Sequence, residues 1–258
     1  MKRKVNEIVK KYSEKLTGIS NIEAILVNDR AANDVYDPNF TIDFDIFHKG
    51  ELVTPDKRQE ILENPAFFET SPVYPVDQFL VDNLPVHLNY KDINGISQVL
   101  DRITKKEWVY RKEMSSVLYR ILKGQVIYSK NGWVNSTREQ ISGISDWFWQ
   151  RVLDSTRFLL ETNLQSLNLS VVTKNHLLYQ TSLATIIDSI SSFIFALHRQ
   201  HKPSTELILS AVKTLENATS EFISWFEALI IPDSELNPEK KYEIATRLTK
   251  WINSLKLE

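Results

Sequence analysis

The pattern of apolar and polar positions changes character near residue 104. Upstream of it, short runs rich in branched apolar residues predict strands, and they are separated by amphipathic segments and turn residues that predict helices. Strands are expected at IEAILV (22–27), FTIDFDIF (40–47), DQFLV (77–81) and PVHLNY (85–90). A helix is expected at the N-terminus, another over 54–62, and a third from Asp92 to about Arg102. The dipeptide Asp82-Asn83 with Leu84 predicts a hairpin turn between the last two strands.

Downstream, apolar residues recur at spacings of three and four, which predicts helices throughout. We expect five of them: 105–124, ending on Gly124; Ser136, with Glu139 as a capping box, to about 163; about 169–200; 203–230; and 238 to the end. The segment VIYS (125–128) predicts a short extended link. The chain is therefore expected to be α+β, with a mixed sheet and helices over 1–104 and an all-α up-and-down bundle over 105–258.

Composition narrows the class of protein without naming a function. The 258 residues are 42% hydrophobic and 25% charged, with a formal net charge of −2. These values are typical of a globular protein and predict no general binding to nucleic acid. The absence of cysteine excludes disulfides and thiolate metal sites. The charged first segment does not resemble a signal peptide, and we expect no membrane-spanning stretch, so a cytoplasmic location is the expectation.

The first candidate chemistry is a pair of acids in an otherwise apolar strand, TIDFDIF (41–47). Asp43 and Asp45 are two residues apart, so in a strand both carboxylates project from one face. Two neighbouring negative charges repel, and burying them is costly unless something neutralises them. A divalent metal is one answer, and a solvated edge strand is the other. If the charges merely repel, replacing either acid by asparagine should leave stability unchanged or raise it.

The segment just upstream of this pair carries a resemblance. AILVNDRAANDV (24–35), followed by Asp-x-Asp on the next strand, resembles the nucleotidyltransferase fold, whose strand ends in Gly-Ser-Arg-Ala-x-Gly-Asp. Placed without gaps, Asn28 and Asp29 stand at Gly-Ser, and Arg30 stands at the arginine. The resemblance implies that Asn28, Asp29 and Arg30 bind a nucleotide. It also implies that Asp43 and Asp45 are catalytic acids holding Mg²⁺ (or Mn²⁺) against the phosphates of ATP.

The helical half adds two weaker resemblances. FALHRQHKPS (195–204) resembles a segment in the helical domains of aminoglycoside-type nucleotidyltransferases, and LYRILKGQVIYSKNGW (118–133) resembles the helix–Gly–strand link that follows their catalytic domain. The basic residues of the second segment, His198 to Lys202, have two readings: they complement a helix dipole or contact phosphate. The aromatic run 147–149 predicts core packing or a homodimer contact.

Three departures from the family pattern keep two functions open. No glycine lies between Gly18 and Gly50, and Asp29 adds an anion where phosphate should bind. The third family acid is missing, because the outward positions of PVHLNY are His87 and Asn89. One hypothesis is transfer of a nucleotide (AMP) from ATP to the hydroxyl of a small molecule or protein. The alternative is a catalytically impaired pseudoenzyme that binds a nucleotide or a partner protein.

Overall fold

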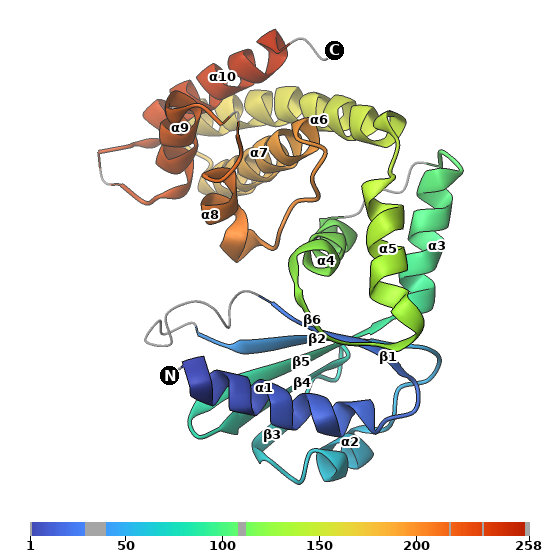
Figure 1. The fold of residues 1–258 in the computed structure, drawn as a ribbon. Helices are drawn as coiled ribbons and strands as arrows, with labels where there is room; N and C mark the ends of the chain where they lie inside the picture. Colours follow the sequence, from blue (N-terminus) through green and yellow to red (C-terminus); the bar gives the residue numbers. More distant parts are fainter. Residues whose placement is uncertain (1, 29–39, 108–111, 217, 234, 256–258) are drawn as a thin grey trace. The chain divides into compact units, whose positions relative to one another are not determined.

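The computed structural model describes residues 2–28, 40–107, 112–216, 218–233 and 235–255, which form an α+β fold (Figure 1). The expected fold class, a mixed sheet with helices followed by a helical region, is confirmed. By its internal contacts the chain divides into two compact units. Unit 1 comprises residues 1–109 and 120–144, and unit 2 comprises 110–119 and 145–258.

The described part of unit 1 is built on one six-stranded sheet in the order β3-β4-β5-β2-β1-β6. Its only parallel pair among the described strands is β2 with β5, and the other neighbours are antiparallel. The strands are β1 (Ile22–Val27), β2 (Ile42–His48), β3 (Ala66–Thr70), β4 (Val76–Val81), β5 (Leu84–Asp92) and β6 (Gln125–Ser129). The predicted hairpin between β4 and β5 is confirmed, because Asp82 and Asn83 both have positive φ, as a tight type I′ turn requires.

Two of these strands differ from the sequence prediction. The edge strand β3 was missed, since its residues are mostly exposed and show no alternation of apolar and polar positions. The expected extended link at 125–128 is instead a full sheet member, β6, paired with β1. Because of that pairing, residues 120–144 belong with the sheet, whereas the predicted boundary near residue 104 assigned them to the helical half.

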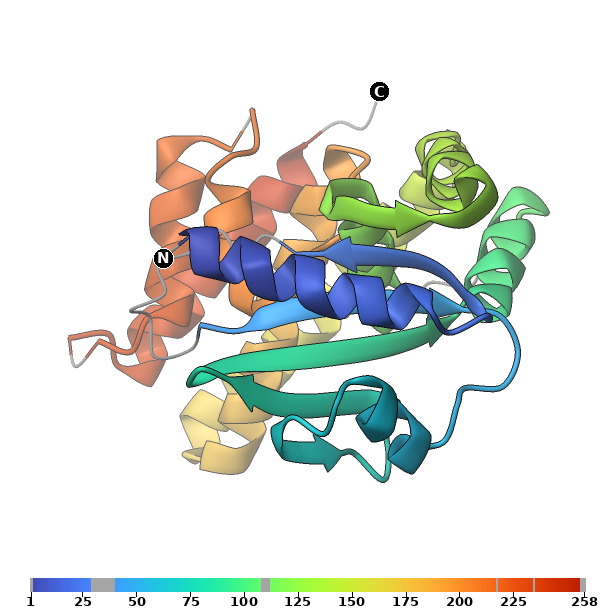
Figure 2. The ribbon, with the colours of Figure 1, turned by 60° about the horizontal axis from the view of Figure 1, so that its bottom comes forward.

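Helices cover both faces of this sheet (Figures 1 and 2). Helix α1 (Lys2–Thr17) lies along one face and packs its apolar side on β1 and β2. Its buried residues and their main partners on the sheet are Val5, Ile8, Tyr12, Leu16, Ile25, Ile42, Phe44 and Ile46. On the other face, α5 (Trp133–Ser142) contacts β1 and β6, and the ring of Trp133 packs on Phe47. The face of the sheet toward α1 is thus apolar, and the opposite face carries Asp43, Asp45 and Phe47 of β2.

Two short helices of unit 1, α2 and α3, are held in place by identifiable polar contacts. Helix α2 (Pro55–Ile61) brings Arg58 against Asp77 of β4, with Nε to Oδ2 at 2.6 Å and Nη2 to Oδ1 at 2.7 Å. Both side chains are buried, and the two parallel hydrogen bonds make this a bidentate, buried ion pair. Helix α3 (Ile93–Thr104) begins as predicted at Asp92, whose side chain accepts a hydrogen bond from the backbone N–H of Asn94 at 3.0 Å.

Unit 2 is helical. Helix α6 (Asp146–Thr173) packs along α7 (His176–Leu197), and α10 (Pro238–Ser254) packs on α6 and on α9 (Ser220–Ile230). The turn between α6 and α7 has Lys174 in the left-handed region and Asn175 capping α7 through Leu178 N at 3.1 Å. The remaining helices are α4 (Lys112–Lys123), through which the division between the units passes, and α8 (Ile208–Val212).

Several helix boundaries in the second half were predicted wrongly. The predicted start at Ser136 is wrong, since α5 begins at Trp133, where Gly132 has φ of 70° and Ser129 Oγ accepts from Val134 N at 3.2 Å. The chain also breaks at Gly143, and the predicted gap near residue 165 is instead the middle of α6. The predicted capping box at Ser136 is wrong because Ser136 lies inside α5. Helix α6 continues through residue 165 because its apolar face, which includes Leu160 and Leu167, is buried.

Helix α7 is long and apolar enough to cross a membrane by length and composition alone, with a mean hydropathy of 1.3 in its most apolar window. The sequence pattern predicts no such segment, because Asp188 and several serines interrupt the apolar run. In the structure, 61% of that window is buried, as in the core helix of a bundle. Serines on α7 bond back to the helix, for example Ser191 Oγ to Ile187 O at 2.6 Å.

Candidate functional site

The two acids lie on one face of a central strand. Asp43 and Asp45 both belong to β2, while Ile42, Phe44 and Ile46 point into the core under α1. The predicted geometry is therefore confirmed. The solvated edge strand is wrong as an explanation, because β2 lies between β5 and β1 and Asp45 is completely buried. Something other than water must compensate its charge.

Asp45 is compensated by side chains from three other segments. The Asn28 amide donates a hydrogen bond to Oδ2, and the Lys91 ammonium donates one to Oδ1. The Nε of Arg120, at the end of α4, lies 3.2 Å from Oδ2. Both oxygens of this carboxylate are thus engaged, and its negative charge faces two positive ones. A buried acid is tolerated here because it is paired and hydrogen-bonded.

Asp43 has a different set of partners. Thr41 Oγ1 donates to its Oδ2 at 3.0 Å, and the Nδ1 of His87 lies 3.2 Å from its Oδ1. The His87 side chain is 30% exposed, so its ring is open to solvent on one side. Asn89, the second residue predicted at the position of the third acid, donates to Phe44 O at 3.3 Å. The structure therefore brings His87 to the acid pair and gives Asn89 a backbone partner.

The register of the parallel strands explains this convergence. Residues 43, 45 and 47 pair with 87, 89 and 91 across the β2–β5 ladder, so their side chains emerge on the same face. Lys91 follows His87 and Asn89 at the same spacing of two. Burial lowers the pKa of the Lys91 ammonium, and the Asp45 carboxylate offsets only part of that effect.

Sequence reasoning missed Lys91 and Arg120. Lys91 could have been found by extending the alternation of the predicted strand beyond residue 90. Arg120 could not, because it lies 75 positions after Asp45 and its only local signal was the resemblance at 118–133.

Gly124 fixes the segment that carries Arg120. A Cβ at Gly124 would lie 2.7 Å from Arg120 O, 3.1 Å from Leu26 Cδ2 and 3.3 Å from Asn28 Oδ1, so only glycine fits without displacement. Arg138 of α5 ties the segment down by donating to Ile121 O at 2.8 Å and Gly124 O at 2.7 Å. The close approach of this segment places Arg120 and Asn28 against the same carboxylate.

The fit of a divalent cation can be judged from these contacts. Mg²⁺ requires nearly octahedral oxygen ligands and tolerates little competition for them. Both oxygens of Asp45 already accept hydrogen bonds or contacts from cationic or amide groups. The described residues contain no group of three or more His, Asp or Glu side chains that could hold a metal. As arranged, they do not fit a divalent cation, and the metal role of Asp43 and Asp45 stays a prediction.

Two predicted nucleotide-binding residues, Asp29 and Arg30, lie outside the described residues. Asn28 is described, and its role in the structure is to hold Asp45.

The basic segment His198 to Lys202 was interpreted from the sequence either as complementing a helix dipole or as contacting phosphate. In the structure, several of its side chains have partners within unit 2. Lys202 Nζ is buried and contacts Asp188 Oδ1 at 2.5 Å, while Arg199 pairs with Asp146 at 2.9 Å. His201 is buried against Trp149, with ring centroids 4.9 Å apart, and burial lowers its pKa to about 3. Core packing of the aromatic run is confirmed for Phe148 and Trp149.

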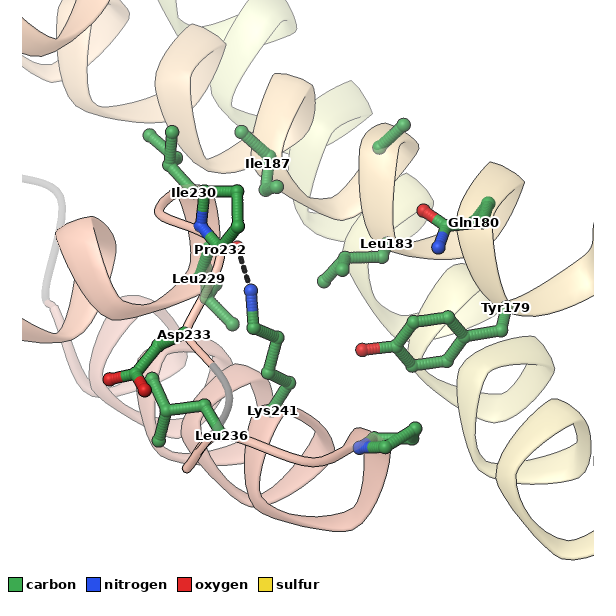
Figure 3. Close-up of a pocket in the computed structure, with 12 residues that line it drawn as sticks. Tyr179, Gln180, Leu183, Ile187, Leu229, Ile230, Pro232, Asp233, Leu236 and Lys241 are labelled. Carbon is green, nitrogen blue, oxygen red and sulfur yellow. Dashed lines mark hydrogen bonds between the residues drawn. The ribbon is translucent and has the colours of Figure 1, made fainter. Parts of the chain in front are cut away.

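Unit 2 also contains a cavity of about 610 Å³ between α7, α9 and α10 (Figure 3). Lys241 lies in its wall and donates to Leu229 O at 3.0 Å and Ile231 O at 3.1 Å. These are carbonyls at the C-terminal end of α9, so the lysine acts as a cap for that helix. The lysine of this cavity is therefore explained by helix capping, and the Asp43–Asp45 face, where several charged groups converge, is the better candidate site.

No protein-family model and no curated protein sequence matches the chain. Among solved structures, it is similar to a nucleotidyltransferase-like protein from Exiguobacterium sibiricum 255-15, at 12% identity and a TM-score of 0.45, over 93% of this chain and 71% of that one. It is also similar to a spectinomycin adenyltransferase from Enterococcus faecialis with ATP and spectinomycin, at 13% identity and a TM-score of 0.39, over 96% and 99%. At this level of likeness, only the residues of the site can support a function.

Proposed function

We propose that the protein is nucleotidyltransferase-like and that the Asp43–Asp45 face of its sheet receives the phosphates of a nucleoside triphosphate. One observation carries the proposal. Separate segments bring two acids, a partly exposed histidine and two cations to one face of the sheet, namely Asp43, Asp45, His87, Lys91 and Arg120. Such a cluster of titratable groups is typical of a functional site. The proposed reaction is transfer of AMP from ATP to the hydroxyl of a small molecule or a protein.

His87 and Asp43 have the arrangement of a general base and its orienting acid. When Nδ1–H of the imidazole is donated to Asp43, Nε2 is left to accept a proton. In the proposed step, Nε2 takes the proton of the acceptor hydroxyl while the hydroxyl oxygen forms a bond to the α-phosphorus of ATP. The bond from that phosphorus to the bridging oxygen breaks, and pyrophosphate leaves. His87 thus takes the position at which the sequence lacks a third acid.

Arg120 is the cation best suited to the phosphates. Its side chain is 23% exposed, against 14% for Lys91, and its guanidinium has donors beyond the Nε that faces Asp45. By the family resemblance, Arg30 would add a further cation for the phosphates, whereas Asp29 would add an anion. An ATP-dependent reaction fits a cytoplasmic protein, which fractionation of cells expressing the tagged chain would test.

A second candidate is favoured by a specific observation. Both oxygens of Asp45 are engaged by Asn28, Lys91 and Arg120, which is the arrangement of a structural ion cluster. The pseudoenzyme alternative, a protein that binds a nucleotide or a partner without transfer, follows if that cluster does not open during a reaction.

The test uses ATP labelled at the α-phosphate, with hydroxylated small molecules or the protein itself as acceptors. The proposal expects labelled product with wild type and a 10²–10⁴-fold lower rate with His87→Gln, the usual range for losing a general base. In His87→Gln, the plot of rate against pH should also lose the rise that deprotonation of the general base produces in wild type. His176→Gln, an exposed histidine in unit 2, is the matched control and should change nothing.

Calorimetry with ATP separates the two candidates. Binding without labelled product would support the alternative. Neither binding nor product at millimolar ATP, measured with and without Mg²⁺, would reject both the transferase and a nucleotide-binding pseudoenzyme, because a ligand well above its dissociation constant must be detected.

A further inference from the structure

The contact between Lys91 and Asp45 bears on which cations this face accepts. The carboxylate of Asp45 is completely buried, and the Lys91 ammonium donates directly to its Oδ1. Its other oxygen is contacted by Asn28 and Arg120. A cation approaching Asp45 must displace one of these groups.

Electrostatics makes that displacement unfavourable for a divalent metal. The two acids carry two negative charges, and Lys91 with Arg120 already balances them within the described residues. A dication added to this balanced cluster would meet two positive charges within a few ångströms, with little solvent to screen them. It would also need lone pairs on Asp45 that are now in use.

An ordinary explanation for Lys91 is a buried ion pair kept for stability. Such pairs are weak evidence for stability, since the cost of desolvation can exceed the attraction. The ordinary explanation makes no statement about metals. A measurement of metal binding therefore distinguishes the two accounts.

We propose that Lys91 is a specificity-determining residue that occupies the place of a divalent cation on Asp45 and excludes such cations from the acid pair. This deepens the proposed function, on which it rests for its biological meaning: phosphates would be received here without a metal held by Asp43 and Asp45. The exclusion itself can be measured without any nucleotide, so its failure and that of the proposed function are distinguishable.

The experiment follows Mn²⁺ binding to the full chain by electron paramagnetic resonance. Wild type should bind Mn²⁺ only weakly. Lys91→Met removes the ammonium and should tighten binding at least tenfold, about 1.4 kcal/mol. Adding Asp45→Asn to Lys91→Met should abolish the gain. Lys105→Met, which removes an exposed lysine of unit 1 paired with Asp101, is the matched control and should behave as wild type.

Lys91→Gln serves as the second variant if Lys91→Met does not fold, because glutamine keeps a hydrogen bond to Asp45 without the charge. A gain in Mn²⁺ binding with either variant supports the proposal. Equal binding by wild type and a folded Lys91 variant overturns it, as does tight binding by wild type that Asp45→Asn removes. Failure of ATP to bind would reject the proposed function and leave the Mn²⁺ result standing.

Discussion

The replacement of Asp45 by asparagine is the most informative single test of the site. Considered as one of two repelling acids, Asp45 should be replaceable with no loss of stability. The structure predicts the opposite sign. Asp45 is completely buried and faces Lys91 and Arg120, so Asp45→Asn leaves two cations with too little negative charge.

The magnitude follows from those contacts. Breaking a buried ion pair by removing one partner costs about 3–5 kcal/mol. Asparagine still offers one carbonyl oxygen, so the lower end applies, and we expect a loss of about 3 kcal/mol. With a urea m-value of about 3 kcal/mol per molar, the midpoint of unfolding should fall by about 1 M.

Because the chain has two compact units, a global melt can mix two transitions. Hydrogen exchange of peptides covering β1, β2 and β5 reports on the affected unit alone. Asp101→Asn, at an exposed pair on α3, is the control and should not change exchange in these strands. Protection of β2 that equals or exceeds that of wild type in Asp45→Asn would refute the assigned ion cluster.

Three further predictions concern other buried features. Burial lowers the pKa of His201 to about 3 from 6.5, so the unfolded chain takes up a proton below about pH 6.5 that the folded chain refuses. Stability present above that pH is lost as pH falls, by about 2 kcal/mol at about pH 5, and His201→Leu should remove this slope in urea titrations. Gly124→Ala should cost about 1–3 kcal/mol through crowding, whereas Gly95→Ala, with open space around it, should be neutral or stabilising by thermal melt. Asp77→Asn should cost about 3–5 kcal/mol by leaving Arg58 buried and unpaired, and an unchanged denaturant midpoint would contradict that pairing.

The sequence by itself determined the elements whose signals are local. Alternation placed Asp43 and Asp45 on one face of a strand, and the same alternation placed His87 and Asn89 on one face of another. The cap at Asp92 and the turn at Asp82-Asn83 were readable because each depends on the chemistry of a few adjacent residues. Periodicity also separated a sheet-forming first part from a helical second part.

Boundaries that depend on packing were not readable. The helix predicted from Ser136 to about residue 163 is two helices, and α6 continues through a stretch that looked like a break. Local propensity is weak compared with the burial of an apolar face, so contacts with α7 and α10 decide where α6 ends.

Only the tertiary structure decided how the charge of the acid pair is compensated. Sequence offered a metal or solvent, and the fold supplies Lys91 from the parallel partner strand and Arg120 from 75 positions downstream. Strand pairing and the close approach at Gly124 bring these groups to one carboxylate. The energy of a charge pair depends on the distance between the charges in space, so separation along the sequence does not reveal which cations are paired with Asp45.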